Sequence, residues 1–154
     1  MRQPLYGGRM KSRALVFALI CLAGCSSEQQ PIAEGPIRLG GSVAVSLPAP
    51  LETPGLLHQL CLALPPGYEV DLSNRELISP AGERGLVSAR LRAETGQWYE
   101  FVQVSLLSKG PERSLCLNSP GVNGHVSLRF VEAEINSSVT WSSPRGYWLS
   151  AEKL

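Results

Sequence analysis

The chain has 154 residues, 44% of them hydrophobic, and its 14 Lys and Arg nearly balance its 13 Asp and Glu, for a net charge of +1. This length is suited to one domain with a sizeable core. The charge balance excludes the broad basic surface that nucleic-acid-binding proteins need. The sequence also lacks the Lys/Arg cluster that favours binding to an anionic membrane surface.

An apolar segment near the N-terminus has the layout of a secretory signal. Lys11 and Arg13 come just before an eleven-residue run, residues 14–24, that ends in small residues. A basic start, a short apolar core and small residues before a cleavage site are typical of such signals. The run is well short of the roughly 20 residues that cross a bilayer. Because Met10 begins a complete signal by itself, we expect translation to start there rather than at Met1.

The end of this segment, Leu22-Ala23-Gly24-Cys25, resembles the lipobox of bacterial lipoprotein signals. The resemblance covers residues 10–25 and implies cleavage after Gly24, palmitate and other acyl chains on Cys25, and a location on the extracytoplasmic side of the cell envelope. Several acyl chains on one residue give stable membrane attachment. In this family an aspartate after the cysteine favours the inner membrane, so Ser26 favours the outer membrane.

The resemblance also sets the expected domain plan. Residues 1–24 form the signal peptide, residues 25–41 the lipidated cysteine and a flexible tether, and residues 42–154 the folded domain. Cleavage leaves 130 of the 154 residues and removes four basic residues but no acidic one, so the mature net charge becomes −3. The tether prediction follows from polar, turn-rich sequence without an apolar period, although Ile32 and Ile37 could dock on the domain.

The first half of the predicted domain alternates apolar and polar residues over short runs, at 43–47 and 68–72, which indicates strands. A third run, Leu60–Leu64, is apolar on both faces and ends sharply at Pro65-Pro66-Gly67.

Cys61 and Cys116 are the cysteines left in the mature chain beside Cys25. Export favours a disulfide between them, and two buried thiols are the alternative. Because the closed loop has 55 residues, a disulfide would stabilise the fold by about 4 kcal/mol.

A β-hairpin is the clearest predicted element. Residues 87–93 alternate apolar and polar, Gly96 supplies a turn within 94–97, and Trp98–Leu107 continues as one long strand. We expect Trp98 to share a face with aliphatic residues and Tyr99 to lie on the other face.

The alternation of apolar and polar residues predicts further strands in the last third of the chain, at residues 114–117, 125–135, 139–141 and 147–151. Between residues 125 and 135 the apolar alternation slips by one position after Phe130, as at a β-bulge. Residues 136–138 interrupt the pattern, and Ser143–Gly146 fits a type I turn.

These elements predict an all-β fold of about eight or nine strands, an antiparallel β-sandwich or a small barrel. The spacing of the cysteines is loosely immunoglobulin-like. However, Ser114 stands where that family has Tyr two residues before its second cysteine, and Trp98 lies 37 residues after Cys61, too far for its core Trp.

Candidate catalytic and metal-ligating residues are few. His58, His125 and Asp71 could form a hydrolytic site only if they met around a serine. His58 and Cys61 lack the further ligands that structural zinc needs, so we expect no metal and no cofactor. Glu132 and Glu134 share a strand face, where charges that protect an edge strand are commoner than catalytic pairs.

Two aromatic clusters suggest a binding surface. Trp98-Tyr99 with Phe101, and Trp141 with Tyr147-Trp148, lie near predicted turns. Adjacent strand residues point to opposite faces, so one member of each adjacent pair should leave the core. We expect Tyr99, Phe101 and Trp148 to form a surface for a ligand or partner.

The sequence therefore predicts a lipid-anchored protein of the bacterial cell envelope that acts as a binding or assembly module. Its partner would be an envelope protein or a glycan. The alternatives are a small hydrolase of an envelope polymer, and an inhibitor of a lytic enzyme that would use a protruding loop such as Asn118–Gly124.

Overall fold

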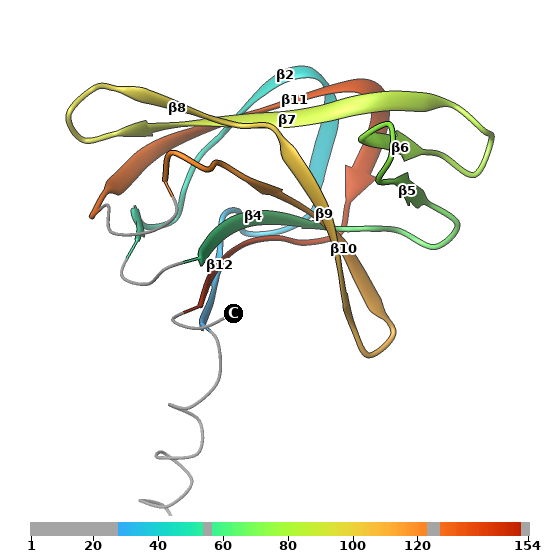
Figure 1. Cartoon of the computed structure of the whole chain (residues 1–154), viewed down its shortest axis with the longest axis horizontal. Helices are drawn as coiled ribbons and strands as arrows, with labels where there is room; N and C mark the ends of the chain where they lie inside the picture. Colours follow the sequence, from blue (N-terminus) through green and yellow to red (C-terminus); the bar gives the residue numbers. More distant parts are fainter. Residues whose placement is uncertain (1–27, 54–56, 123–126, 152–154) are drawn as a thin grey trace, which may run out of the picture.

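The computed structural model describes residues 28–53, 57–122 and 127–151, which form twelve strands and no helix (Figure 1). The strands pair in two antiparallel sheets that pack face to face, which confirms the predicted β-sandwich. The five-stranded sheet has the order β1 (Glu28–Pro31), β12 (Gly146–Ala151), β4 (Leu57–Ala63), β10 (Glu112–Asn118) and β9 (Gln103–Lys109). The seven-stranded sheet has the order β2 (Ile37–Val45), β11 (Arg129–Ser143), β7 (Arg84–Ala93), β6 (Glu76–Ile78) and β5 (Glu69–Asp71), with β3 (Leu51–Glu52) beside β11 and β8 (Trp98–Phe101) beside β7.

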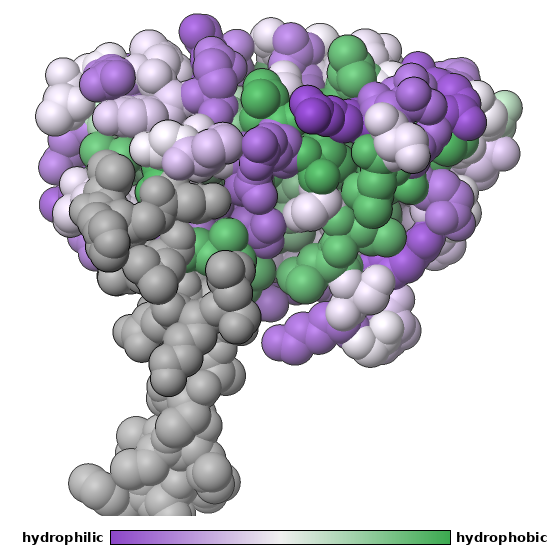
Figure 2. Space-filling model, in the orientation of Figure 1, coloured by the Kyte–Doolittle hydropathy of each residue, from purple (hydrophilic) through white to green (hydrophobic). Residues whose placement is uncertain are grey.

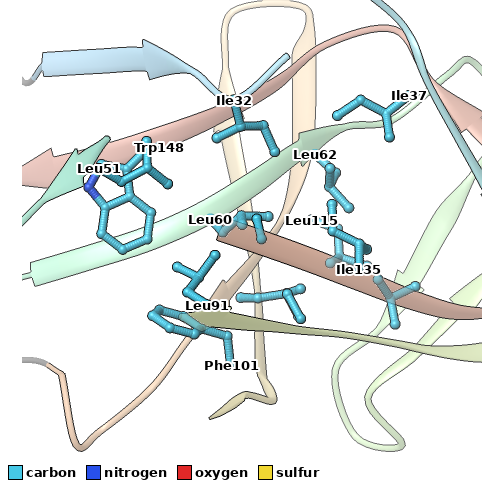
Figure 3. Packing of buried hydrophobic residues seen from close by; sticks show 14 of the residues in the cluster. Ile32, Ile37, Leu51, Leu60, Leu62, Leu91, Phe101, Leu115, Ile135 and Trp148 are labelled. Atoms are coloured by element: carbon cyan, nitrogen blue, oxygen red, sulfur yellow. The ribbon is translucent and has the colours of Figure 1, made fainter. Parts of the chain in front are cut away.

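The main core fills the space between the two sheets. Inward-facing residues of both sheets interdigitate there, among them Leu60, Leu91 and Trp148 (Figure 3). The indole Nε1 of Trp148 donates a hydrogen bond to the carbonyl oxygen of Glu52 at 2.9 Å. The largest buried side chain thus satisfies its polar atom and connects the two sheets.

Residues 28–41, which we expected to belong to the tether, are largely part of the sandwich. They supply β1 and the first half of β2, and Ile32, Ile37 and Leu39 are buried in the core. The Gln30 side-chain amide donates to the carbonyl of Pro50 at 3.0 Å. Both strands lie at sheet edges, where a few apolar residues are enough to pack a strand on the core. Their sequence therefore shows no clear alternation of apolar and polar residues.

The long strand expected at Trp98–Leu107 is two strands that belong to different sheets. The hairpin of β7 and β8 is confirmed, with Arg92 opposite Trp98. The chain then crosses at Val102 to the other sheet, where β9 pairs with β10. Tyr99 and Phe101 face the core before the crossing and Val104 faces it afterwards, so the inward phase shifts by one residue at Val102.

The strand β11 runs without interruption through the predicted break at residues 136–138. The predicted slip is confirmed, since the register against β7 shifts between Phe130 and Glu132. A second shift, against β2, lies between Ser137 and Trp141. Ser137 is buried, yet its hydroxyl donates to the Val139 carbonyl at 2.7 Å and accepts from the Trp141 indole at 3.1 Å. Because these local bonds satisfy the buried polar atoms, the strand forms a bulge at this point and does not end.

Candidate functional site

The predicted aromatic surface is wrong, because its members lie inside the sandwich. Phe101 is 0% and Trp148 2% exposed, and Tyr99 is half-buried with its ring edge on Phe130 at 5.7 Å. The rings of Phe101 and Trp148 pack edge to face at 5.8 Å. The sequence showed that each adjacent pair must split between two faces, but it could not show which member faced inward.

The other member of each pair points outward. Tyr147 lies on the outer face of the five-stranded sheet, in a small apolar cluster with Cys61, Cys116 and Leu149. Trp98 lies on the outer face of the seven-stranded sheet, where the guanidinium of Arg90 is 4.4 Å from the centre of its ring. The two outer faces are therefore chemically different.

The outer face of the five-stranded sheet is closed by a stack of side chains. Cys61 and Cys116 are opposite residues of β4 and β10 and form the predicted disulfide. The Tyr147 hydroxyl donates to Ser114 Oγ at 2.9 Å, and the guanidinium of Arg145 lies 4.3 Å from the centre of the Tyr147 ring. We call this disulfide with Tyr147 and Arg145 the Arg145 stack. Arg145 also donates to Gln29 of β1 and Glu112 of β10, which fixes it across the sheet.

His58 and Asp71 do not meet in a hydrolytic site. His58 belongs to β4, is 0% exposed and stacks on Trp148 at 5.9 Å, and burial lowers its pKa below 6.5. Asp71 ends β5 in the other sheet, where hydrogen bonds from Asn74, then Arg84, lower the pKa of its carboxyl. His125 lies outside the described residues, as does Cys25.

Cys61 is not available as a metal ligand. Cys61 is bonded to Cys116, so it cannot chelate a metal together with His58. Among residues 28–53, 57–122 and 127–151 no three His, Cys, Asp or Glu gather as metal ligands. The same segments contain no helix that could span a membrane.

The predicted loop Asn118–Gly124 is described only as far as residue 122. Ser119 and Val122 are buried, and the Val122 amide donates to the Ser119 carbonyl at 3.0 Å. This part of the loop is a turn whose Val122 packs on the core, while Pro120 and Gly121 are exposed.

Glu132 and Glu134 do not protect an edge, because β11 lies between β2 and β7 inside its sheet. Each carboxylate accepts from an arginine on the neighbouring strand, Arg92 to Glu132 at 2.7 Å and Arg90 to Glu134 at 3.0 Å. The bond from Arg92 lowers the pKa of Glu132. The sequence contained the two arginines of β7 at matching spacing, but the pairing of β7 with β11 could not be read from it.

These ion pairs and Trp98 form one continuous surface, which we call the Arg–Glu face: Arg90, Arg92, Trp98, Glu132 and Glu134. It borders a hollow of about 240 Å³ lined in part by Ser88, Glu100 and Asn136. Figure 2 shows mainly hydrophilic residues along the upper rim, over the seven-stranded sheet, and hydrophobic residues below them between the sheets. The face therefore offers charged groups in fixed positions beside one large aromatic ring.

The chain was compared with known proteins at three levels. A scan against protein-family models, a search of curated proteins and a search of solved structures each found no match.

Proposed function

We propose that this protein is a lipid-anchored binding or assembly module of a bacterial cell envelope, and that the Arg–Glu face binds its partner. The single observation that carries the proposal is Trp98 held by Arg90 among cross-strand Arg–Glu pairs. The lipobox resemblance at Cys25 supports the location, and the disulfide is consistent with export.

The chemistry of the face suits recognition of another protein. Trp and Arg supply a large share of the binding energy at protein interfaces. Here the cation–π contact and the ion pairs already restrict their side chains, which lowers the entropic cost of binding. Because the guanidinium of Arg90 lies over the Trp98 ring, it competes with a sugar that would stack there. A protein partner is therefore favoured over a glycan.

The anchor would hold the sandwich close to the membrane by β1, an edge strand of the five-stranded sheet, whereas the Arg–Glu face lies on the outer side of the other sheet. The first strand begins at Glu28, three residues after Cys25, and three extended residues span at most about 11 Å. A sandwich attached in this way lies near the bilayer by its five-stranded sheet, which leaves the Arg–Glu face of the other sheet accessible to a protein of the same envelope. Ser26 favours the outer membrane.

The anchor is tested separately from the face. Replacement of Cys25→Ser should abolish incorporation of labelled palmitate and release the protein from the membrane fraction. Unchanged labelling in this variant would contradict lipidation at Cys25, whatever the face binds.

The face is tested by crosslinking in the native envelope. A photo-crosslinking residue at Asn136, which is exposed beside the Arg–Glu face, should capture one protein in stoichiometric yield. The control carries the photo-crosslinking residue in place of Gln103, which is exposed on the five-stranded sheet. This control should capture no protein. Capture of glycan alone from position 136, or equal capture from both positions, would refute the proposal.

A charge swap gives a sharper test. The double change Arg92→Glu with Glu132→Arg keeps an ion pair across β7 and β11 but reverses its direction. We expect an unchanged melting temperature and loss of the crosslink from Asn136. Retention of the crosslink would mean that these charges do not take part in binding.

A further inference from the structure

The strand β2 is an edge of the seven-stranded sheet, and among the described residues it pairs with β11 on one side only. A hollow of about 540 Å³ runs beside it. The loop before β2 contributes Ala33 and Pro36 to this hollow, and β2 and the residues after it contribute Val43, Val45 and Leu47. The hollow thus combines a mainly apolar lining with a strand whose outer backbone edge pairs with no other described strand.

A bend in β2 shapes the hollow. The strand pairs with β11 in one register over residues 41–45 and in another over residues 37–39. Gly41 has φ +69°, a left-handed conformation, and a Cβ at Gly40 would lie 3.1 Å from Thr140 Oγ1. The Gly40-Gly41 pair therefore allows β2 to curve, so that residues from both of its halves line the hollow.

The β2 edge carries few of the features that block pairing with another chain. Among its nine residues Arg38 is the one charged residue, and there is no proline. The opposite edge of the same sheet, β5, has three residues, and two of them are Glu69 and Asp71. Val43, Val45 and Leu47 are half-buried and pack on the core, so an added strand could cover apolar surface that is already ordered.

The charges at the hollow point to the chemistry of the occupant. Six of the eight arginines in the described ranges form ion pairs, and the exceptions are Arg38 at the hollow and Arg75 elsewhere. Both Arg38 and Glu34 line the hollow and are exposed. An acidic residue would therefore find an available guanidinium at this site.

We propose that the hollow beside β2 binds an extended segment of another protein, with alternating apolar residues and a carboxylate for Arg38, which adds to the sheet as an extra strand. Such β-strand addition combines main-chain hydrogen bonds with pockets for alternate side chains. A second copy of this chain fits less well. Antiparallel pairing of two β2 strands about Gly41 would place Arg38 opposite Ala44 rather than an acid.

The probe is a displayed library of random nine-residue peptides, selected against the full-length protein in detergent. We expect enriched peptides to alternate apolar residues and to carry an Asp or Glu. Binding of one such synthetic peptide, measured by fluorescence polarisation, should slow hydrogen exchange of β2 amides, which a contact made through side chains alone would not do.

Two matched pairs of variants locate the site. Ser46→Trp places a large ring in the hollow and should abolish binding, whereas Ser42→Trp, on β2 but outside the lining, should not. Arg38→Glu should weaken binding about tenfold, near 1.4 kcal/mol, and a peptide with Lys in place of its acid should recover it. Arg75→Glu is the matched control and should have no effect.

Three outcomes would overturn the inference: failure to enrich any peptide, equal binding by the Ser46→Trp variant, or self-association of the protein through β2. None of them bears on the Arg–Glu face, because these variants leave its five residues unchanged.

Discussion

The outer faces of the two sheets are stabilised in different ways. The outer face of the five-stranded sheet is covered by the Arg145 stack, in which Cys61, Cys116 and Tyr147 are almost fully buried. On the seven-stranded sheet the outer face holds partly exposed ion pairs, and that sheet buries apolar residues mainly on its inner side. Substitutions on the first face should therefore damage the fold, whereas the second face can change without loss of stability and is free for recognition.

The largest effect is expected from removal of the disulfide. The double change Cys61→Ala with Cys116→Ala opens a 55-residue loop and should lower the free energy of unfolding by about 4 kcal/mol. Urea denaturation monitored by tryptophan fluorescence measures this loss. Treatment of the unaltered protein with reductant under denaturing conditions, followed by refolding, should give a similar decrease. A loss below about 1 kcal/mol would mean that Tyr147 and Arg145 hold this face without the disulfide.

A smaller effect is expected from Tyr147→Phe. The change keeps the ring over the disulfide but removes the donor to Ser114 Oγ, which is buried. Loss of a buried hydrogen bond should cost about 1–2 kcal/mol in the same denaturation experiment. Tyr99→Phe is the control, since the ring of Tyr99 packs on Phe130 through contacts that phenylalanine can keep. Equal losses in both variants would contradict a specific role for the Tyr147 hydroxyl.

As pH falls, the first loss of stability should come from His58, on the inner side of the five-stranded sheet. Burial lowers the pKa of His58 below 6.5, so between pH 6.5 and that lower pKa the unfolded chain binds a proton that the folded chain does not. Stability is therefore complete above about pH 6.5 and falls as pH decreases through this window, by at most about 1.4 kcal/mol per pH unit. Denaturation curves at several pH values check this, and His58→Phe should remove the slope. A slope that persists in the variant would assign it to another group.

The smallest effect is expected from Arg92→Ala on the Arg–Glu face. The ion pair with Glu132 is partly exposed, and such pairs contribute little in water and salt. The free energy of unfolding should stay close to that of the unaltered protein. The pKa of Glu132, which Arg92 lowers, should rise toward its usual value, as measured by NMR titration. Since the folded pKa is depressed, any stability from this pair is lost as pH falls through that pKa, below the His58 window.

The sequence was most informative where structure is local. The alternation in β7, the turn at Gly96 and the slip after Phe130 each depend on neighbouring residues, and each was confirmed. Sheet membership was not readable, because Trp98–Leu107 alternates in the same way whether it stays in one sheet or crosses between two. The aromatic surface failed for a related reason, since the inward member of each pair depends on long-range packing around Trp148.

The crossing at Val102 makes the sandwich a single mechanical unit. Only this residue separates β8 in one sheet from β9 in the other, whereas packed sheets lie about 10 Å apart. Because of this short link, the two sheets cannot slide past each other or separate at this corner unless the β7–β8 or the β9–β10 pairing is lost. β1 also continues through residues 32–36 into β2 of the opposite sheet, so a partner on the Arg–Glu face would be held in a fixed orientation relative to the start of β1.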